Sequence, residues 1–240
     1  MGRTRIRDRA RRAADGSARR VPASRVRLDG GGGGAGLLDQ ELAAGSLIAG
    51  VDEAGRGSLA GPVVAAAVIL PPGAVLPGLT DSKLLTPAAR TRLADAIRTV
   101  ARSWAVAAVE AEDIDLMDIL RATLHAMVGA VRQLAPQPDL VLVDGNVIPR
   151  LPMPARAIVQ GDRRVPAISA ASILAKVTRD RIMEDWAARF PAYGFARHKG
   201  YGTVAHRAAI AEHGPSPIHR LTFAGVREYA GKAGLQARLW

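Results

Sequence analysis

Four carboxylates lie at or just beyond the ends of three segments that the sequence predicts to be buried strands. They are Asp52, Glu53, Asp144 and Asp162. Burial of an ionised carboxylate is costly unless something compensates the charge, and a lone acid at such a place is usually a helix cap or an ion-pair partner. Four acids at three strand ends fit that explanation poorly. If adjacent strands bring them together, their repulsion is severe, and a divalent cation would relieve it.

The residue types that could hold such an ion are restricted. The chain contains no Cys, which excludes disulfides, thiolate metal sites and Cys nucleophiles. Carboxylate oxygens favour Mg²⁺ or Mn²⁺ over Zn²⁺. Two such ions about 4 Å apart suit in-line phosphoryl displacement, because one activates the water and the other stabilises the leaving oxygen. The five His residues lack metal-ligand spacing and receive no catalytic role, although His198 and His206 could touch phosphate.

Glycines follow the first two acids. Neighbours on a strand point to opposite faces, so Asp52 and Glu53 can serve one site only where the strand ends and the chain curls. Gly55 and Gly57 permit that curl, and they let backbone groups approach a ligand closely. Arg56 can pair with phosphate, and backbone contacts to a 2′-hydroxyl would distinguish RNA from DNA. A simple tight turn is the alternative interpretation.

Hydrophobic runs define the elements that must position these residues. The expected strands are residues 46–52, 62–70, 103–109, 140–143 and 155–159. Helices are expected from Pro87, after a Thr86 cap, to about 100, over 112–134 in one or two pieces, from 166 to about 190, and around 203–213 and 222–230. Hairpin-like strands followed by alternating strands and helices predict an α/β domain with a mixed sheet.

Two of these helices have a predicted inner face. The first should bury Leu93, Ile97 and Val100. The inner stripe of the 112–134 segment should be Leu120, Leu124, Met127, Val128 and Val131.

Composition and charge point to a polyanionic partner without identifying it. The 240 residues carry a net charge of +11, and clustered cations bind phosphate. Arg outnumbers Lys by 29 to 4, which a charge-biased proteome would also produce. Residues 1–45 hold ten Arg, five acids and a GGGGAG run, and we expect a disordered basic arm there. The longest apolar run is far shorter than the roughly 20 residues of a membrane span, and it is expected to be a buried strand. We also expect the protein to be cytoplasmic and monomeric.

Six segments together resemble ribonuclease HII, in the order of that family. They are GVDEAGRG at 50–57, DSK at 81–83, VDGN at 143–146, GD at 161–162, PAISAASILAKVTRD at 166–180 and HKGYGT at 198–203. The resemblance covers about residues 46–230. It implies a ribonuclease H-like fold, with a central mixed sheet flanked by helices and a helical C-terminal extension. Residues 231–240 would form a flexible tail.

The resemblance also implies an activity and its residues. The expected reaction is hydrolysis of the RNA strand of RNA–DNA hybrids and incision 5′ of ribonucleotides in duplex DNA, with Asp52, Glu53, Asp144 and Asp162 holding two Mg²⁺ or Mn²⁺ ions. Gly55, Arg56 and Gly57 would read the 2′-hydroxyl, and Tyr201 would pack on the sugar just 3′ of the ribonucleotide. Contacts to phosphates, or supports for the acids, are expected from Ser82, Lys83, Ser169, Ser172, Lys176 and Lys199. The two serines on the 166–190 helix could equally be small residues in tight packing.

Three points lie outside this pattern or compete with it. Leu84 stands where the family commonly has a second Lys, so one phosphate contact is absent. The tail Gln236–Trp240 resembles peptides that dock on bacterial sliding clamps, although it could also fold back or fray. The rival functions are a DNA-cutting integrase or resolvase of the same fold, against which Gly55–Gly57 and Tyr201 argue, and a non-catalytic hybrid-binding module, which would have lost the acids.

Overall fold

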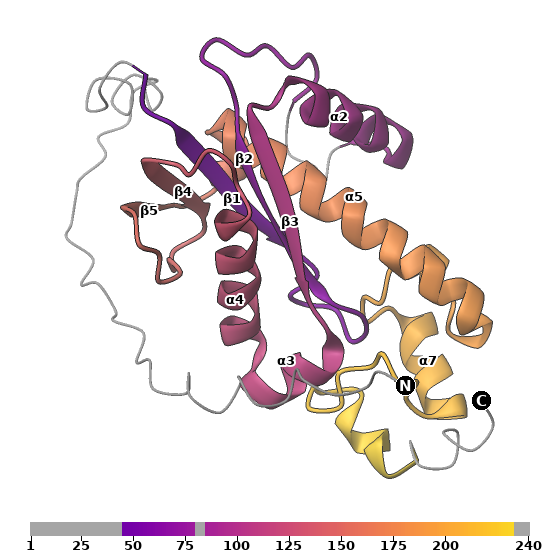
Figure 1. Cartoon of the computed structure of the whole chain (residues 1–240). Helices are drawn as coiled ribbons and strands as arrows, with labels where there is room; N and C mark the ends of the chain where they lie inside the picture. The colour runs from indigo at the N-terminus through magenta and orange to yellow at the C-terminus, as the bar shows by residue number, and fades with distance from the viewer. Residues whose placement is uncertain (1–44, 80–84, 233–240) are drawn as a thin grey trace, which may run out of the picture. The chain divides into compact units, whose positions relative to one another are not determined.

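A mixed five-stranded sheet forms the centre of the protein (Figure 1). The computed structural model describes residues 45–79 and 85–232. The strands are β1 Ile48–Ala54, β2 Val63–Ile69, β3 Ser103–Val109, β4 Leu140–Asp144 and β5 Ala155–Ile158. Their order is β3-β2-β1-β4-β5, antiparallel across β3, β2 and β1, and parallel across β1, β4 and β5. The predicted mixed-sheet α/β fold is confirmed.

Helices cover both faces of the sheet. One face packs against α4 Ile119–Arg132, and the other against α5 Pro166–Arg189, with α2 Pro87–Val100 beside α5. All seven residues of β2 are buried, and its side chains alternate between the two layers, Ala65 towards α4 and Ala66 towards α5. Small side chains let both helices approach the sheet closely. Nearly continuous apolar strands are typical of a sheet covered on both sides.

The first helix begins as the sequence predicts. The Thr86 hydroxyl accepts a hydrogen bond from the Ala89 amide, and Pro87 occupies the first turn. Leu93 and Ile97 are buried against α5, as expected. Val100, at the last position of the helix, is 37% exposed and does not join that face.

The segment predicted over 112–134 is two helices, α3 Ala111–Met117 and α4. Asp118 separates them, because its φ of 75° ends α3 while its carboxylate accepts from the Arg121 amide and caps α4. Leu120, at the second position of α4, is 39% exposed, so the predicted inner stripe is wrong there, although Met127 and Val131 are buried as expected.

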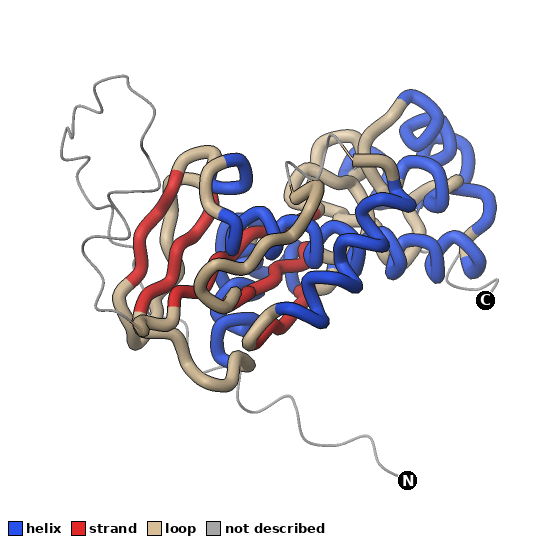
Figure 2. The backbone as a smooth tube through the Cα atoms, turned by 90° about the horizontal axis from the view of Figure 1, so that it is seen from above, coloured by secondary structure: helices blue, strands red, loops and turns tan. Residues whose placement is uncertain are grey.

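The C-terminal part is helical and packs at the end of α5 (Figure 2). Its elements are η3 Pro191–Tyr193, α6 Phe195–His198, α7 Val204–His213 and η4 Arg227–Lys232. Thr203 caps α7, as its predicted range implies. The helix expected over 222–230 is instead the 3₁₀ helix η4, which begins later. Between β5 and α5 lies η2 Gly161–Arg163.

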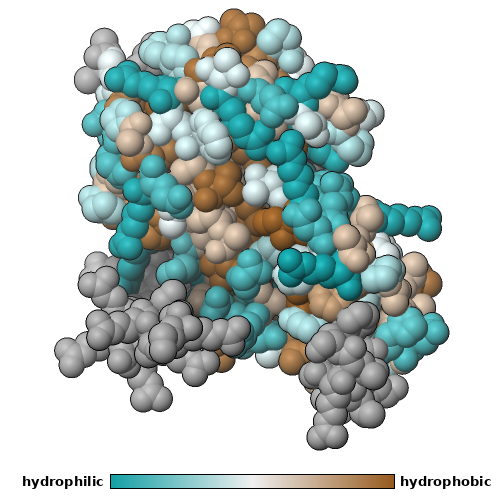
Figure 3. All heavy atoms as spheres, turned by 45° about the vertical axis from the view of Figure 1, so that its right-hand side comes forward, coloured by the Kyte–Doolittle hydropathy of each residue, from teal (hydrophilic) through white to brown (hydrophobic). Residues whose placement is uncertain are grey.

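Hydrophilic and hydrophobic side chains are mixed over the face shown in Figure 3. Within residues 45–79 and 85–232, none of the helices has the length and apolarity that crossing a membrane requires. The predicted basic arm at 1–45 lies, apart from residue 45, outside the described residues, and so does nearly all of the predicted tail at 231–240.

Close contact between β1 and α5 generates a prediction about stability. A Cβ on Gly50 would lie 2.1 Å from the Ala167 carbonyl carbon, and backbone cannot move aside as a flexible side chain can. We expect Gly50→Ala to lower the free energy of unfolding by about 3 kcal/mol or more, measured by urea denaturation. Gly231→Ala is the matched control, since nothing lies within 4 Å of the added carbon. Equal stability of the two variants would contradict this packing.

Candidate active site

Strand β1 extends beyond its parallel neighbour and carries two of the predicted acids into the resulting gap. The last β1–β4 pair is Val51 with Val143, whereas β1 stays paired with β2 as far as Ala54. The expectation that the strand ends at Asp52 is therefore wrong. Asp52 and Glu53 lie within the strand, and they can serve one site because β4 has stopped beside them.

Asp52 is buried on the α5 side of the sheet. Only 6% of it is exposed, and its carboxylate accepts hydrogen bonds from the Glu53 amide at 2.7 Å and from the Ser172 side chain. Burial raises the pKa of Asp52 well above its usual value, and the charges of Glu53 and Asp144 raise it further. Three predicted site acids are therefore within electrostatic reach of one another.

Glu53 belongs to the same group but has a cationic partner. Burial raises the pKa of its carboxyl, Arg56 opposes that rise, and Asp144 adds to it. The Arg56 guanidinium lies 3.3 Å from the Glu53 carboxylate, and its side chain is half exposed. Arg56 thus partly compensates the charge of Glu53 from the solvent side.

The fourth acid is placed beside Asp144 by the backbone. Gly161 and Asp162 donate their amides to the Asp144 carboxylate at 2.7 and 3.4 Å. The Ser169 hydroxyl donates to the carbonyl of Asp162, which is buried at the start of η2. Ser169 and Ser172 are one turn apart on α5, both 6% exposed, and their hydroxyls bond to protein groups around the acids.

The donor chemistry fits a divalent cation. In the described chain, no three His, Asp or Glu side chains already stand as a complete metal-binding group. Mg²⁺ does not need one, since it keeps several waters and binds through one or two carboxylates together with substrate phosphates. Burial, and then the charges of Glu53 and Asp144, raise the pKa of Asp52, and a bound cation would favour its ionised form. The residues available for it are Asp52, Glu53, Asp144 and Asp162.

A buried arginine holds the glycine turn that follows β1. Gly55 has a φ of 94°, a left-handed conformation that favours glycine. Arg220 is fully buried and donates to the carbonyls of Gly55 at 2.7 Å, Arg56 at 2.8 Å and Gly61 at 3.0 Å. Arg220 thus holds the turn of Gly55, Arg56 and Gly57 from the protein interior, while Arg56 and Gly57 remain exposed to solvent.

A second buried arginine connects this turn to the Tyr201 loop. Arg179 on α5 donates to the carbonyls of Ala60 at 3.0 Å, Pro62 at 2.9 Å and Lys199 at 2.9 Å. A Cβ on Gly55 would come within 2.0 Å of the Arg179 guanidinium. Neither arginine was predicted as a site residue from the sequence. A charged residue on an otherwise buried stretch of helix was the available signal for Arg179, whereas Arg220 lies in a loop and gave none.

Tyr201 is 38% exposed on a loop that is held at three backbone points. Arg179 binds the Lys199 carbonyl, the Gly200 amide donates to His198 Nδ1 at 3.2 Å, and His206 Nδ1 lies 3.0 Å from the Tyr201 carbonyl. The ring stands 5.5 Å from the Lys176 ammonium and 5.4 Å from the Arg179 guanidinium. Tyr201 is therefore a positioned aromatic surface beside cations, as stacking on a nucleotide would need.

Two neutral histidines, His219 and His206, form a chain of hydrogen bonds that ends at this loop, and we call it the histidine relay. The Ser216 amide donates to His219 Nδ1, so the proton of His219 is on Nε2, 3.0 Å from His206 Nε2. His206 therefore carries its own proton on Nδ1 and donates it to the Tyr201 carbonyl. Burial lowers the pKa of His206 to about 4 and that of His219 to about 3. The interpretation of His206 as a phosphate contact is wrong, because it is fully buried.

The remaining predicted contacts are divided between a pocket and the undescribed segments. Lys176 and Lys199 lie beside Tyr201 in a polar pocket. Ser82, Lys83 and the departure at Leu84 lie outside the described residues, as does the tail Gln236–Trp240.

The histidine relay predicts a stability change with pH. An unfolded His gains a proton near pH 6.5, whereas folded His206 resists it down to about 4, so stability falls as the pH drops through this range. His206 alone should cost about 2.5 kcal/mol between pH 7.5 and 4.5. We expect His206→Asn, which keeps a donor but does not titrate, to remove that part of the slope in urea unfolding. His125→Asn, at an exposed position on α4, should keep the wild-type slope, and two equal slopes would refute the relay.

Three solved structures of ribonucleases H have the same fold. The ribonuclease H2 of Pyrococcus horikoshii is 27% identical, with a TM-score of 0.66, over 78% of this chain and 98% of that one. The ribonuclease HII of Archaeoglobus fulgidus, solved in complex with PCNA, is 27% identical, with a TM-score of 0.63, over 74% of this chain and 95% of its own. A ribonuclease HIII in complex with Mn²⁺, at 21% identity and a TM-score of 0.59, shares the fold over 78% of this chain and 70% of its own.

Other relatives are more similar in sequence than these solved structures. The family model for ribonuclease HII matches residues 49–226. The ribonuclease HII of Coxiella burnetii is 58% identical over 182 residues, which are 76% of this chain and 90% of that protein. That of Nitratidesulfovibrio vulgaris is 54% identical over 206 residues, 81% of this chain and 93% of its own. The chain belongs to the ribonuclease HII family, and it is a hydrolase, a nuclease with ribonuclease H activity on RNA–DNA hybrids.

Proposed function

We propose that the protein also incises duplex DNA 5′ of an embedded ribonucleotide, leaving 3′-hydroxyl and 5′-phosphate ends, with two divalent ions at Asp52, Glu53, Asp144 and Asp162. One observation carries the proposal. The mutual repulsion of Asp52, Glu53 and Asp144 is concentrated directly beside the turn of Gly55, Arg56 and Gly57. The acids that would act on the phosphate thus lie next to the backbone turn that would contact the sugar hydroxyl, and two of them closely precede that turn in the sequence.

The ions would be Mg²⁺ or Mn²⁺, because the donors are carboxylate oxygens. When bound, they supply activation of a water and stabilisation of the leaving oxygen. The chain itself keeps the acids in place. The Ser172 side chain orients Asp52, the Gly161 amide orients Asp144, and Arg56 shields Glu53 from the solvent side. Burial of Asp52 keeps bulk water from competing for its carboxylate.

Ribose recognition follows from the way the turn is held. Arg220 occupies the carbonyls of Gly55 and Arg56, so the turn keeps its shape without side chains at Gly55 and Gly57. A sugar can then approach the backbone closely, and a 2′-hydroxyl can bond to it where deoxyribose cannot. Tyr201 is joined to this turn through Arg179 and through the Ser58–Tyr201 bridge, and it would pack on the adjacent sugar.

The expected setting is removal of ribonucleotides from DNA in the cytoplasm, by a monomer. The contacts assigned to phosphates in this setting are Ser82, Lys83, Ser169, Ser172, Lys176 and Lys199. Ser169 and Ser172 are buried and bond to the acid loops, which favours a supporting role for them over direct contact with substrate.

The Archaeoglobus relative was solved in complex with PCNA, a sliding clamp. We propose that this chain also docks on a clamp, through Gln236–Trp240. Titration of a bacterial sliding clamp with a peptide of residues 225–240 should give saturable binding. A peptide in which Leu239 and Trp240 are replaced by Ala should not bind, because the apolar anchors are missing. Absence of binding up to high micromolar concentrations would end this proposal.

Cleavage of a labelled duplex with one ribonucleotide tests the main proposal. With Mg²⁺ we expect one cut 5′ of the ribonucleotide, and none in an all-DNA duplex of the same sequence. Asp52→Asn should lower the rate by at least about a thousandfold, because it removes a buried charge at the reacting centre. Asp113→Asn, exposed on α3, is the charge-matched control and should cut normally.

Other outcomes separate the rival functions. Cutting of both duplexes would favour a DNA-processing nuclease of the same fold. If the wild type cuts neither duplex, nor a long hybrid with Mn²⁺, only a binding module would remain.

A further inference from the structure

Asp115 on α3 joins two distant parts of the chain through a single carboxylate. One of its oxygens accepts from the Leu221 amide at 2.6 Å. The other accepts from the Thr222 amide at 3.0 Å and from the Thr222 hydroxyl at 2.6 Å. Figure 1 shows α3 beside the C-terminal segment that carries these partners. The carboxylate therefore fixes the backbone of Leu221 and Thr222, the two residues that follow Arg220.

The segment that carries Arg220 is also held on its other side. The Arg220 amide donates to the Leu59 carbonyl at 2.9 Å, and the Gly61 amide donates to the Ile218 carbonyl at 2.8 Å. Residues 218–222 thus lie between Asp115 and the chain that follows the glycine turn of Gly55, Arg56 and Gly57. With its backbone fixed on both sides, the buried Arg220 guanidinium has a defined position.

Arg220 sets the direction of two peptide groups in the glycine turn. Its guanidinium binds the carbonyls of Gly55 and Arg56 from the interior. The N–H of a trans peptide points away from its carbonyl, so the amides of Arg56 and Gly57 face the exposed side of the turn. In the part of the chain that the structure describes, neither amide donates to a protein acceptor. A charged donor on each carbonyl also polarises the peptide group, which strengthens its amide as a donor.

Asp115 acts on Arg220 through its charge as well. Burial and the charge of Arg179 lower the pKa of Arg220 to about 9, whereas the charge of Asp115 raises it. Burial of a guanidinium is costly, and a nearby carboxylate offsets part of that cost. Asp115 therefore supports Arg220 both through the backbone of the next two residues and by favouring its charged form.

We propose that Asp115 and Arg220 are positioning residues for ribose discrimination. Asp115 fixes the segment that carries Arg220, and Arg220 directs the amides of the glycine turn towards the sugar hydroxyl. The proposal rests on the proposed function, because it assumes that this turn reads the 2′-hydroxyl. Neither residue would touch the substrate. Helix α3, which packs against α4 on the face of the sheet opposite α5, would thus influence which sugar is accepted.

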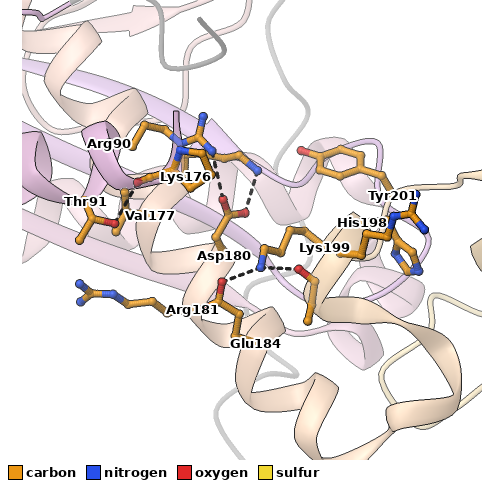
Figure 4. Close-up of a pocket in the computed structure, with 13 residues that line it drawn as sticks. Arg90, Thr91, Lys176, Val177, Asp180, Arg181, Glu184, His198, Lys199 and Tyr201 are labelled. Atoms are coloured by element: carbon orange, nitrogen blue, oxygen red, sulfur yellow. Dashed lines mark hydrogen bonds and ion pairs between the residues drawn. The ribbon is translucent and has the colours of Figure 1, made fainter. Parts of the chain in front are cut away.

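Tyr201 has supports of its own. Arg179 and His206 hold the backbone of its loop, and Figure 4 shows its ring directed towards Lys176 of α5. None of these contacts comes from α3. A change at Asp115 should therefore affect the glycine turn more than stacking on Tyr201, and general affinity for duplexes should be retained.

Competition for the ribonuclease H activity tests the proposal with the full chain. Cleavage of a labelled RNA–DNA hybrid is measured with two unlabelled competitors of one sequence, an all-DNA duplex and the same duplex with one ribonucleotide. A hydrogen bond to the 2′-hydroxyl should make the ribonucleotide duplex the tighter competitor of the wild type by about fivefold to tenfold. We expect Asp115→Asn to lower this ratio to about twofold or less, because an amide group cannot replace both carboxylate oxygens as acceptors. The inhibition constant of the all-DNA duplex should stay at the wild-type value.

Three further variants control the result. Asp113→Asn, exposed on the same helix, is the charge-matched control and should keep both inhibition constants. Arg220→Lys keeps the charge but loses the planar fork that reaches several carbonyls, so it should lower the ratio as Asp115→Asn does. Thr222→Val removes one of the three bonds to Asp115 at an exposed position and should lower the ratio by less. Asp115→Asn and Thr222→Val keep the test valid if Arg220→Lys does not fold.

Two results would overturn the proposal. One is a wild-type ratio in Asp115→Asn, and the other is a rise of both inhibition constants by the same factor, which a general loss of structure would cause. Failure of the proposed function looks different. The wild type itself would then be inhibited equally by both competitors and would leave the ribonucleotide duplex uncut, and this outcome would remove the role of Asp115 together with ribose recognition by the turn.

Discussion

Repulsion among Asp52, Glu53 and Asp144 is the constraint on which the rest of the structure depends. Burial makes the charges of Asp52 and Glu53 more costly, and the charge of Asp144 adds to the cost, as the raised pKa of both carboxyls shows. The fold tolerates this because β1 is held on both sides up to Val51 and by β2 alone beyond it. A rigid, fully covered sheet keeps the acids together, where a flexible loop would let them separate.

Two buried arginines extend that rigidity to the substrate side. Arg220 binds the glycine turn and Arg179 binds the segment from Ala60 to Pro62 together with the Tyr201 loop, all through backbone carbonyls. Burial of a guanidinium is costly unless its donors are used, and here several carbonyls accept from each. Helix α5 and the loop that carries Arg220 therefore support the glycine turn and the Tyr201 loop. The neutral histidines complete this support, since a protonated His219 could not accept from the Ser216 amide.

The pocket beside Tyr201 gives the basic composition of the chain a specific location. A net charge of +11 says only that polyanions are attracted. Lys176 and Lys199 are partly buried and are held by Asp180 and Glu184 on α5. They therefore present that attraction at fixed positions along this helix. The single long α5 contacts both the sheet and the C-terminal elements, so it connects the lysine pairs to the strand that carries Asp52.

Much of this arrangement could be predicted from the sequence. Short-range signals determined the strands, the Thr86 cap, the mixed-sheet class and the acids with their glycine turn, because periodicity and turn chemistry act over a few residues. Tertiary structure alone decided the rest. The extension of β1 past β4 depends on strand register, and the division into α3 and α4 depends on the backbone conformation of Asp118. The roles of Arg179, Arg220 and His206 depend on carbonyls 5 to 165 positions away in the chain. Such contacts leave no local pattern, since a buried arginine or histidine looks in the sequence like any exposed one.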